Sequence, residues 1–155
     1  MAVECWSSLH RLVVAGIYQQ EVYDSLRGEV DLLTPSGTST LHLACTQEND
    51  DVFIHLLNAD ADVNATNKSG ETPLHWVCRS QRSSWVKTLL KCGASLSAID
   101  AQGDPPLHWA IEADNPRITR LLLSRGASPY VVNRAGQQAA DVADFWDSTR
   151  CRPLL

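Results

Sequence analysis

The sequence lacks the long apolar segment that a membrane-spanning helix requires. A helix needs about 20 mostly apolar residues to cross a bilayer, and the longest uncharged stretch near the N-terminus, residues 12–20, falls well short of that. The same region lacks the basic start and uncharged apolar run of a secretory signal, because Glu4, His10 and Arg11 interrupt it. We therefore expect a soluble intracellular protein, in the cytoplasm, the nucleus or both.

Basic residues are also scarce relative to acidic ones. The chain has 13 Lys and Arg against 18 Asp and Glu, a net charge of -5 over 155 residues, which argues against a general nucleic-acid binder. Seven Pro and eight Gly are too few for a fibrous or low-complexity chain, and 44% hydrophobic residues are too many for a disordered one. Five cysteines cannot all pair within one chain, and we expect reduced thiols.

Motifs of the common enzyme classes are absent as well. The sequence has no nucleophile elbow, zinc-protease helix, phosphate-binding loop or paired-carboxylate pattern. His42 with Cys45 and His75 with Cys78 have the look of two halves of a zinc site. Zinc ligands must converge to within ~4 Å of one another, whereas equivalent residues of stacked helical units are about 8–10 Å apart. We therefore expect no catalytic site, no metal and no cofactor.

What the sequence does contain is a repeat of 33 residues, unbroken by insertion or deletion from residue 34 to residue 133. Glycines, histidines and leucine pairs recur at this interval: Gly37, Gly70, Gly103 and Gly136; His42, His75 and His108; Leu56-Leu57, Leu89-Leu90 and Leu122-Leu123. Self-similarity at a fixed period of this length is typical of a repeat array, in which each unit buries its apolar face on its neighbours.

Each unit can be interpreted as a turn followed by two helices. The turn NKSGE at 67–71 contains a glycine, which allows an open backbone conformation. Thr72 can then cap a short first helix, with Pro73 at its first position. The second helix carries apolar residues at helical spacing and ends at Gly93. In the preceding unit Asp60 occupies that glycine's place, although aspartate adopts a left-handed conformation less readily.

The segments ETPLHWV at 71–77 and DPPLHWA at 104–110 resemble the ankyrin repeat closely. TSTLHLA at 38–44 has Thr40 where that family usually has proline, and Pro105 stands in place of the usual capping threonine. The resemblance implies an all-α solenoid with three repeats, a degenerate N-terminal cap and a partial C-terminal cap, over residues 1–33, 34–66, 67–99, 100–132 and 133–155. It also implies that His42, His75 and His108 are structural and bond the backbone of the turns.

The same resemblance implies a non-enzymatic protein-binding module, an adaptor or a regulatory inhibitor, that holds another protein in its concave groove and at its turn tips. We expect it to be monomeric in isolation and to have no membrane contact. Carrying the contact positions over by repeat phase places them at Pro35, Ser36, Thr38, Lys68, Ser69, Glu71, Ala101, Gln102 and Asp104 in the turns, and at Thr46, Gln47, Arg79, Ser80, Glu112 and Ala113 at the ends of the first helices.

Aromatic residues divide into two groups. Trp76, Trp109 and Trp85 hold phases that predict core positions between repeats. Phe145 and Trp146 hold the phase of Thr46 and Gln47, which in this family faces the groove. They either anchor a partner or are covered by the C-terminal tail.

Charge is distributed unevenly along the array. Residues 34–66 contain five acidic and no basic residues, whereas residues 67–99 contain five basic residues and one acidic residue. The basic repeat is either a solvated face or, through Arg79 and Arg82, a contact for an acidic partner segment. Two alternatives remain: an anionic ligand or nucleic acid bound by this repeat, although the acidic neighbour would repel phosphate, or a structural fragment of a larger scaffold.

Overall fold

The computed structural model describes residues 7–16, 18–19, 27–47 and 49–155, so the other residues of the predicted N-terminal cap lie outside it. The described residues form eight α-helices and two short 3-10 helices, without a β-strand; Leu33 and Ser39 form an isolated antiparallel bridge. The predicted all-α repeat solenoid is confirmed.

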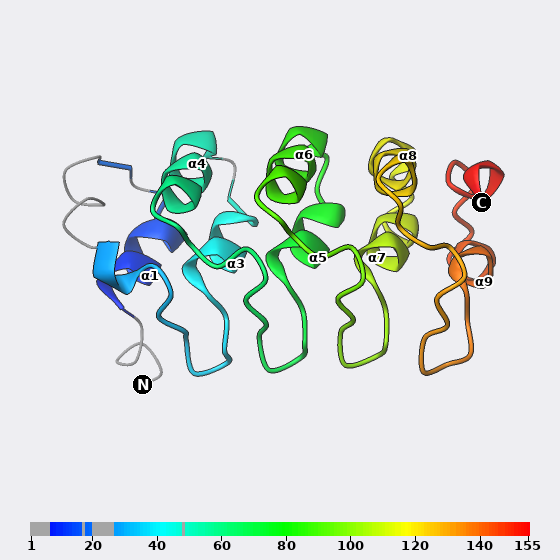
Figure 1. Cartoon of the computed structure of the whole chain (residues 1–155), viewed down its shortest axis with the longest axis horizontal. Helices are drawn as coiled ribbons and strands as arrows, with labels where there is room; N and C mark the ends of the chain where they lie inside the picture. The colour runs from blue at the N-terminus through cyan, green and yellow to red at the C-terminus, as the bar shows by residue number, and fades with distance from the viewer. Residues whose placement is uncertain (1–6, 17, 20–26, 48) are drawn as a thin grey trace.

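The helices follow one another in pairs along an elongated array. In chain order they are α1 (Ser8–Val14), η1 (Arg27–Glu29), α3 (Thr40–Ala44), α4 (Asp50–Asn58), α5 (Pro73–Cys78), α6 (Ser83–Lys91), α7 (Pro106–Glu112), α8 (Pro116–Ser124), α9 (Ala139–Phe145) and η2 (Arg152–Leu154). Figure 1 shows α4, α6 and α8 in one row above α3, α5, α7 and α9, with the turns projecting below and the two termini at opposite ends.

The core is a continuous apolar layer between the two rows of helices. Leu56, Leu89 and Leu122, which are equivalent in the three repeats, are each fully buried, and burying one such side chain contributes about 1.5–3 kcal/mol. Trp85 is buried as predicted and stacks on Phe53 with ring centroids 4.2 Å apart. Each unit thus completes its core with its neighbour.

The turns below the helices are joined by one backbone hydrogen bond per junction. The amide of Lys68 donates to the Ser36 carbonyl oxygen at 3.0 Å, and the amide of Ala101 donates to the Ser69 carbonyl oxygen at 2.7 Å. Gly70 lies at such a junction with φ +73°, and a Cβ there would come within 3.2 Å of the Asp100 Cα. Its hydrogen side chain is therefore required both by the backbone conformation and by the adjacent turn.

A buried histidine joins each of the first helices α3 and α5 to the next repeat. The Thr72 amide donates to Nδ1 of His75 at 3.0 Å, so Nε2 carries the ring proton and donates to the Asp104 carbonyl oxygen at 3.1 Å. His42 reaches the Glu71 carbonyl oxygen in the same way at 2.9 Å. These two histidines have the predicted structural role.

His10 extends this series into the N-terminal cap. It lies fully buried on α1, and its Nε2 is 3.3 Å from the Thr38 carbonyl oxygen. Helix α1 packs against α3. The described part of the cap therefore attaches to the first repeat through the same contact that joins the repeats to one another.

His108 departs from the series, and the prediction for it was wrong. Pro105 offers neither an amide hydrogen nor a hydroxyl group, so Nδ1 of His108 instead lies 2.7 Å from Oδ1 of Asp104. Because a carboxylate accepts, Nδ1 must carry the proton. Nε2 does not reach a carbonyl oxygen of the next turn and has no partner among the described residues, although His108 is only 2% exposed.

The C-terminal segment is held by contacts of a different kind. Ser148 Oγ donates to the Ile111 carbonyl oxygen at 2.7 Å, and Asp114 accepts hydrogen bonds from Arg150 Nε at 2.8 Å and from the Cys151 amide at 3.1 Å. Burial acts to raise the pKa of Asp114, but the hydrogen bonds from Arg150 and Cys151 outweigh it and lower that pKa. The segment consequently packs beside α8, where Cys151 is fully buried.

Replacing Gly70 with alanine tests the turn junction, with Gly136 as the matched position. Gly136 has a similar φ of +79° but nothing within 4 Å of a built Cβ. We expect Gly136→Ala to lower the free energy of unfolding by about 1–2 kcal/mol through backbone strain alone, and Gly70→Ala to lower it by a further ~1–3 kcal/mol through crowding. Urea denaturation of both variants measures the difference. Equal losses of unfolding free energy would contradict the close approach of the two turns at Gly70.

The buried histidines predict a pH-dependent stability. Burial lowers the pKa of His10, His42 and His75, and the hydrogen bonds to backbone carbonyls only partly offset it. The unfolded chain therefore binds protons that the folded chain does not, starting near the ordinary histidine pKa of about 6.5. The free energy of unfolding should be constant between about pH 7 and 8 and fall as the pH is lowered from 7 towards 5. Denaturation curves at successive pH values measure this, and a flat profile would contradict it.

Candidate functional site

The end of the groove nearest the C-terminus contains a hollow of about 590 Å³. It lies between α7 and α9 and the turns at 100–104 and 133–137, and we call it the C-terminal hollow. We call the first helices of the units, α3, α5, α7 and α9, the inner helices. The lining of the hollow includes Asp104, Trp109, Glu112, Gln137, Phe145 and Trp146. Both inner helices end here, since Glu112 is the last residue of α7 and Phe145 the last of α9.

Two aromatic side chains stand open at this hollow. Phe145 is 70% exposed and Trp146 is 53% exposed, and their rings meet edge to face with centroids 5.4 Å apart. The C-terminal tail packs on α8 and α9 without burying them. The interpretation that the tail covers these rings was therefore wrong.

Trp109 forms one wall of the hollow and is only partly core. Its ring meets His75 edge to face at 5.5 Å, and its Nε1 donates to Asp100 Oδ2 at 3.0 Å. Trp76 repeats this arrangement one unit earlier, against His42 and Glu71. The predicted core role thus holds for one side of each indole, while the other side lines the groove.

Arg79 lies in the groove beside Trp109. Its guanidinium carbon is 5.0 Å from the Trp109 ring centroid, and Nη2 donates to Glu112 Oε1 at 2.8 Å. Both contacts reach into the following repeat, so the arginine joins α5 to α7. A second, smaller hollow lies against it, lined in part by Trp76 and Ser80.

Arg82 lies directly before α6 and contacts the preceding repeat. It donates to Asp50 Oδ1 and stacks over Trp85 with its guanidinium carbon 4.5 Å from the ring centroid. Trp85 Nε1 donates to the same Asp50 oxygen at 2.7 Å. Arg79 and Arg82 therefore do not form one surface, and each already bonds an acidic residue of a neighbouring repeat.

Comparison with known proteins agrees with this architecture. A family model described as Ankyrin repeats (3 copies) matches residues 41–133, more than half of the chain. The chain belongs to the ankyrin-repeat family. Ankyrin repeats are in general protein–protein interaction modules and are typically non-enzymatic. A search of curated proteins gives no match to the chain.

The contact positions predicted for the ankyrin array differ in their exposure. Those that are exposed are Pro35, Ser36, Thr46, Lys68, Ser69, Arg79, Ala101, Gln102 and Trp146. Those that are half-buried are Gln47, Glu71, Ser80, Arg82, Asp104, Glu112 and Ala113. Thr38 is buried, with 6% exposure, and its hydroxyl lies 2.8 Å from that of Ser36, so it supports the turn from within.

Sequence reasoning missed several residues that line the C-terminal hollow, namely Trp109, Asn133, Arg134 and Gln137. Residues 133–137 hold the same repeat phase as residues 100–104. Extending the contact positions by one more period would have found the turn residues. Trp109 carried no such signal, because a tryptophan at a helical core phase has the same pattern whether one or both of its faces are buried.

The described residues contain no group of three or more His, Cys, Asp and Glu side chains that could hold a metal ion. Burial raises the pKa of the Cys45 and Cys78 thiols, which keeps them protonated. Cys45, Cys78, Cys92 and Cys151 are free thiols. Within the described part of the ankyrin array, no helix is long and apolar enough to cross a membrane.

The exposure of Trp146 predicts that it contributes little to the stability of the ankyrin array. We expect Trp146→Ala to change the free energy of unfolding by no more than about 0.5 kcal/mol, as for other surface substitutions. Trp85→Ala, which removes a buried and stacked indole, should cost about 3–5 kcal/mol. Urea denaturation compares the two variants, and a large loss for Trp146→Ala would mean that the side chain is part of the core.

Proposed function

We propose that this ankyrin array binds another protein in its concave groove and acts by occupancy, as an adaptor or a regulatory inhibitor. The observation that carries the proposal is the exposed pair Phe145 and Trp146 beside Trp109 at the C-terminal hollow. Large aromatic side chains are enriched among the residues that dominate binding energy at protein interfaces. Their exposure has no explanation in the packing of the array itself.

The groove is also suited to binding because its walls are already fixed. The His42 and His75 hydrogen bonds hold successive inner helices in place, and the Arg79–Glu112 ion pair joins the ends of two of them. A surface fixed in advance loses little conformational entropy when a partner binds. We propose that the array is monomeric and that the partner is the component that adapts.

An acidic partner segment facing both Arg79 and Arg82 has less support. Such a segment would have to displace Glu112 from one arginine and Asp50 from the other. The same two contacts lessen the support for an anionic ligand or a nucleic acid bound by this repeat.

Affinity capture with matched variants tests the proposal. Tagged wild-type chain, Trp146→Ala and Tyr130→Ala are expressed in the native cell, and co-purified proteins are quantified. Tyr130 is 74% exposed and does not line the hollow, so its truncation is the control. We expect at least one protein to be reduced about tenfold or more by Trp146→Ala, a loss typical of an interface anchor, and to be retained by Tyr130→Ala. Identical recovery by all three chains would contradict binding at this site.

A further inference from the structure

We infer that the partner inserts a lysine or arginine side chain into the C-terminal hollow. The inference rests on the proposed function and specifies the chemistry of the partner. Four features of the hollow support it: the charge of its lining, its unused acceptor oxygens, its aromatic walls and the helix ends that meet there.

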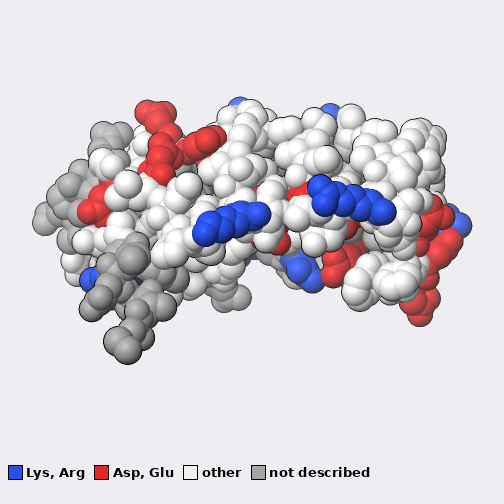
Figure 2. Space-filling view, turned by 90° about the horizontal axis from the view of Figure 1, so that it is seen from below, with Lys and Arg blue, Asp and Glu red and all other residues white. Residues whose placement is uncertain are grey.

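The lining is negatively charged. Asp100, Asp104 and Glu112 contribute three carboxylates, against Arg134 in the lining and Arg79, which pairs with Glu112 from beside the hollow. Asp100 is almost fully buried, and its oxygens accept hydrogen bonds from backbone amides and from Trp109 rather than from a cation. Figure 2 shows basic side chains along the turns and acidic ones gathered towards both ends of the array. A cation entering the hollow therefore meets an attractive field.

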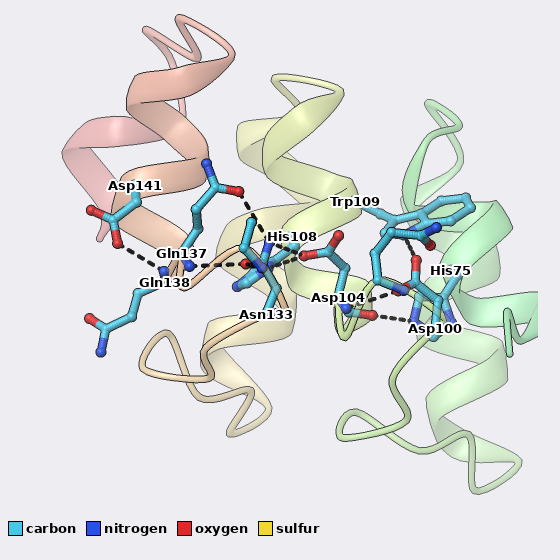
Figure 3. Close-up of polar contacts among 11 residues, drawn as sticks. His75, Asp100, Asp104, His108, Trp109, Asn133, Gln137, Gln138 and Asp141 are labelled. Carbon is cyan, nitrogen blue, oxygen red and sulfur yellow. Dashed lines mark hydrogen bonds and ion pairs between the residues drawn. The ribbon is translucent and has the colours of Figure 1, made fainter. Parts of the chain in front are cut away.

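Two carboxylate oxygens in the lining are available to an incoming donor. Asp104 bonds His108 and Asn133 through Oδ1 alone, at 2.7 and 2.8 Å, and Glu112 bonds Arg79 through Oε1 alone. Oδ2 of Asp104 and Oε2 of Glu112 have no hydrogen-bond donor among the described residues; Figure 3 shows the former pointing away from His108. Ammonium and guanidinium groups carry several N–H donors and no acceptor, which suits this pair.

The aromatic walls favour the same occupant. A cation over a tryptophan or phenylalanine face gains about 0.5–2 kcal/mol, depending on its desolvation. Arg79, which lines the neighbouring smaller hollow, shows that a guanidinium can lie over Trp109 while bonding Glu112. Phe145 and Trp146 are two further exposed rings, and no Lys or Arg of the described residues lies over either of them. In addition, the C-terminal ends of α7 and α9 bring partial negative charge to the hollow.

Other occupants fit less well. An acidic side chain would be placed beside three carboxylates, which repel it at short range. A purely apolar side chain would cover the rings but would also remove water from Oδ2 of Asp104 and Oε2 of Glu112 without replacing its hydrogen bonds, at a cost of about 1–3 kcal/mol for each polar group left unpaired. A basic side chain with an apolar stem satisfies both the rings and the oxygens.

Selection from a random 12-residue peptide library displayed on phage tests this inference without knowledge of the natural partner. The full chain is the target, and the selected peptides are titrated against purified variants. We expect arginine and lysine to be enriched in peptides whose binding requires Trp146. Their Kd should rise about tenfold for Trp146→Ala and a few-fold for Glu112→Gln. It should be unchanged for Tyr130→Ala and for Asp51→Asn, which makes the same change in net charge on α4, away from the hollow.

Arg79→Ala separates the possible outcomes. Removing Arg79 frees Glu112 and one face of Trp109, so basic peptides should bind more tightly to this variant. Enrichment of Asp and Glu, with binding weakened by Arg79→Ala, would overturn the inference and leave the proposed groove intact. Apolar peptides indifferent to Glu112→Gln would also overturn it. If no selected peptide depends on Trp146, the proposed function and the inference fail together.

Discussion

The hydrogen bond from a buried histidine to a carbonyl of the next repeat is the interaction on which the array depends. It fixes the distance between consecutive inner helices, because Nδ1 of His42 or His75 is held by its own helix cap while Nε2 reaches the following turn. Nδ1 must be unprotonated to accept from the cap amide while Nε2 carries the proton that it donates, so the two contacts together require a neutral ring, and burial favours that state. Stacking, turn geometry and the shape of the groove all follow from this contact.

The last junction shows what happens when that contact is lost. Pro105 removes the donor that holds Nδ1, so Nδ1 of His108 instead donates to the Asp104 carboxylate. The C-terminal segment is joined by the backbone hydrogen bond from the Arg134 amide to the Gln102 carbonyl oxygen and by side chains, with Asn133 bonding Asp104 and Arg150 bonding Asp114. One substitution in a capping position therefore both ends the histidine series and holds a carboxylate at the edge of the C-terminal hollow.

The 33-residue period was sufficient to predict the helix pairs and the buried leucines, and the resemblance to the ankyrin repeat implied the roles of His42 and His75. Each of these depends only on one unit and its equivalent neighbour. It was insufficient where a contact depends on a residue specific to one repeat. Predicting that His108 does not bond the next turn would have required noting that Pro105 has no amide hydrogen to donate to Nδ1. The exposure of Phe145 depended on the path of the tail, which Ser148 and Asp114 determine through contacts 36 or 37 residues apart in sequence. A repeat phase carries no information about such contacts.

The charge pattern changes meaning once side chains are placed. An acidic repeat next to a basic one implies a surface that attracts anions, but Arg79 and Arg82 bond carboxylates of the flanking repeats and so hold the array together. Oppositely charged side chains of adjacent repeats form ion pairs at the junction. A partner therefore contacts only the charged groups that these ion pairs leave unpaired. At the C-terminal hollow that remainder is negative and lies against exposed aromatic rings. Which charges of such an array remain available to a partner therefore depends on which of them the repeat junctions have already paired.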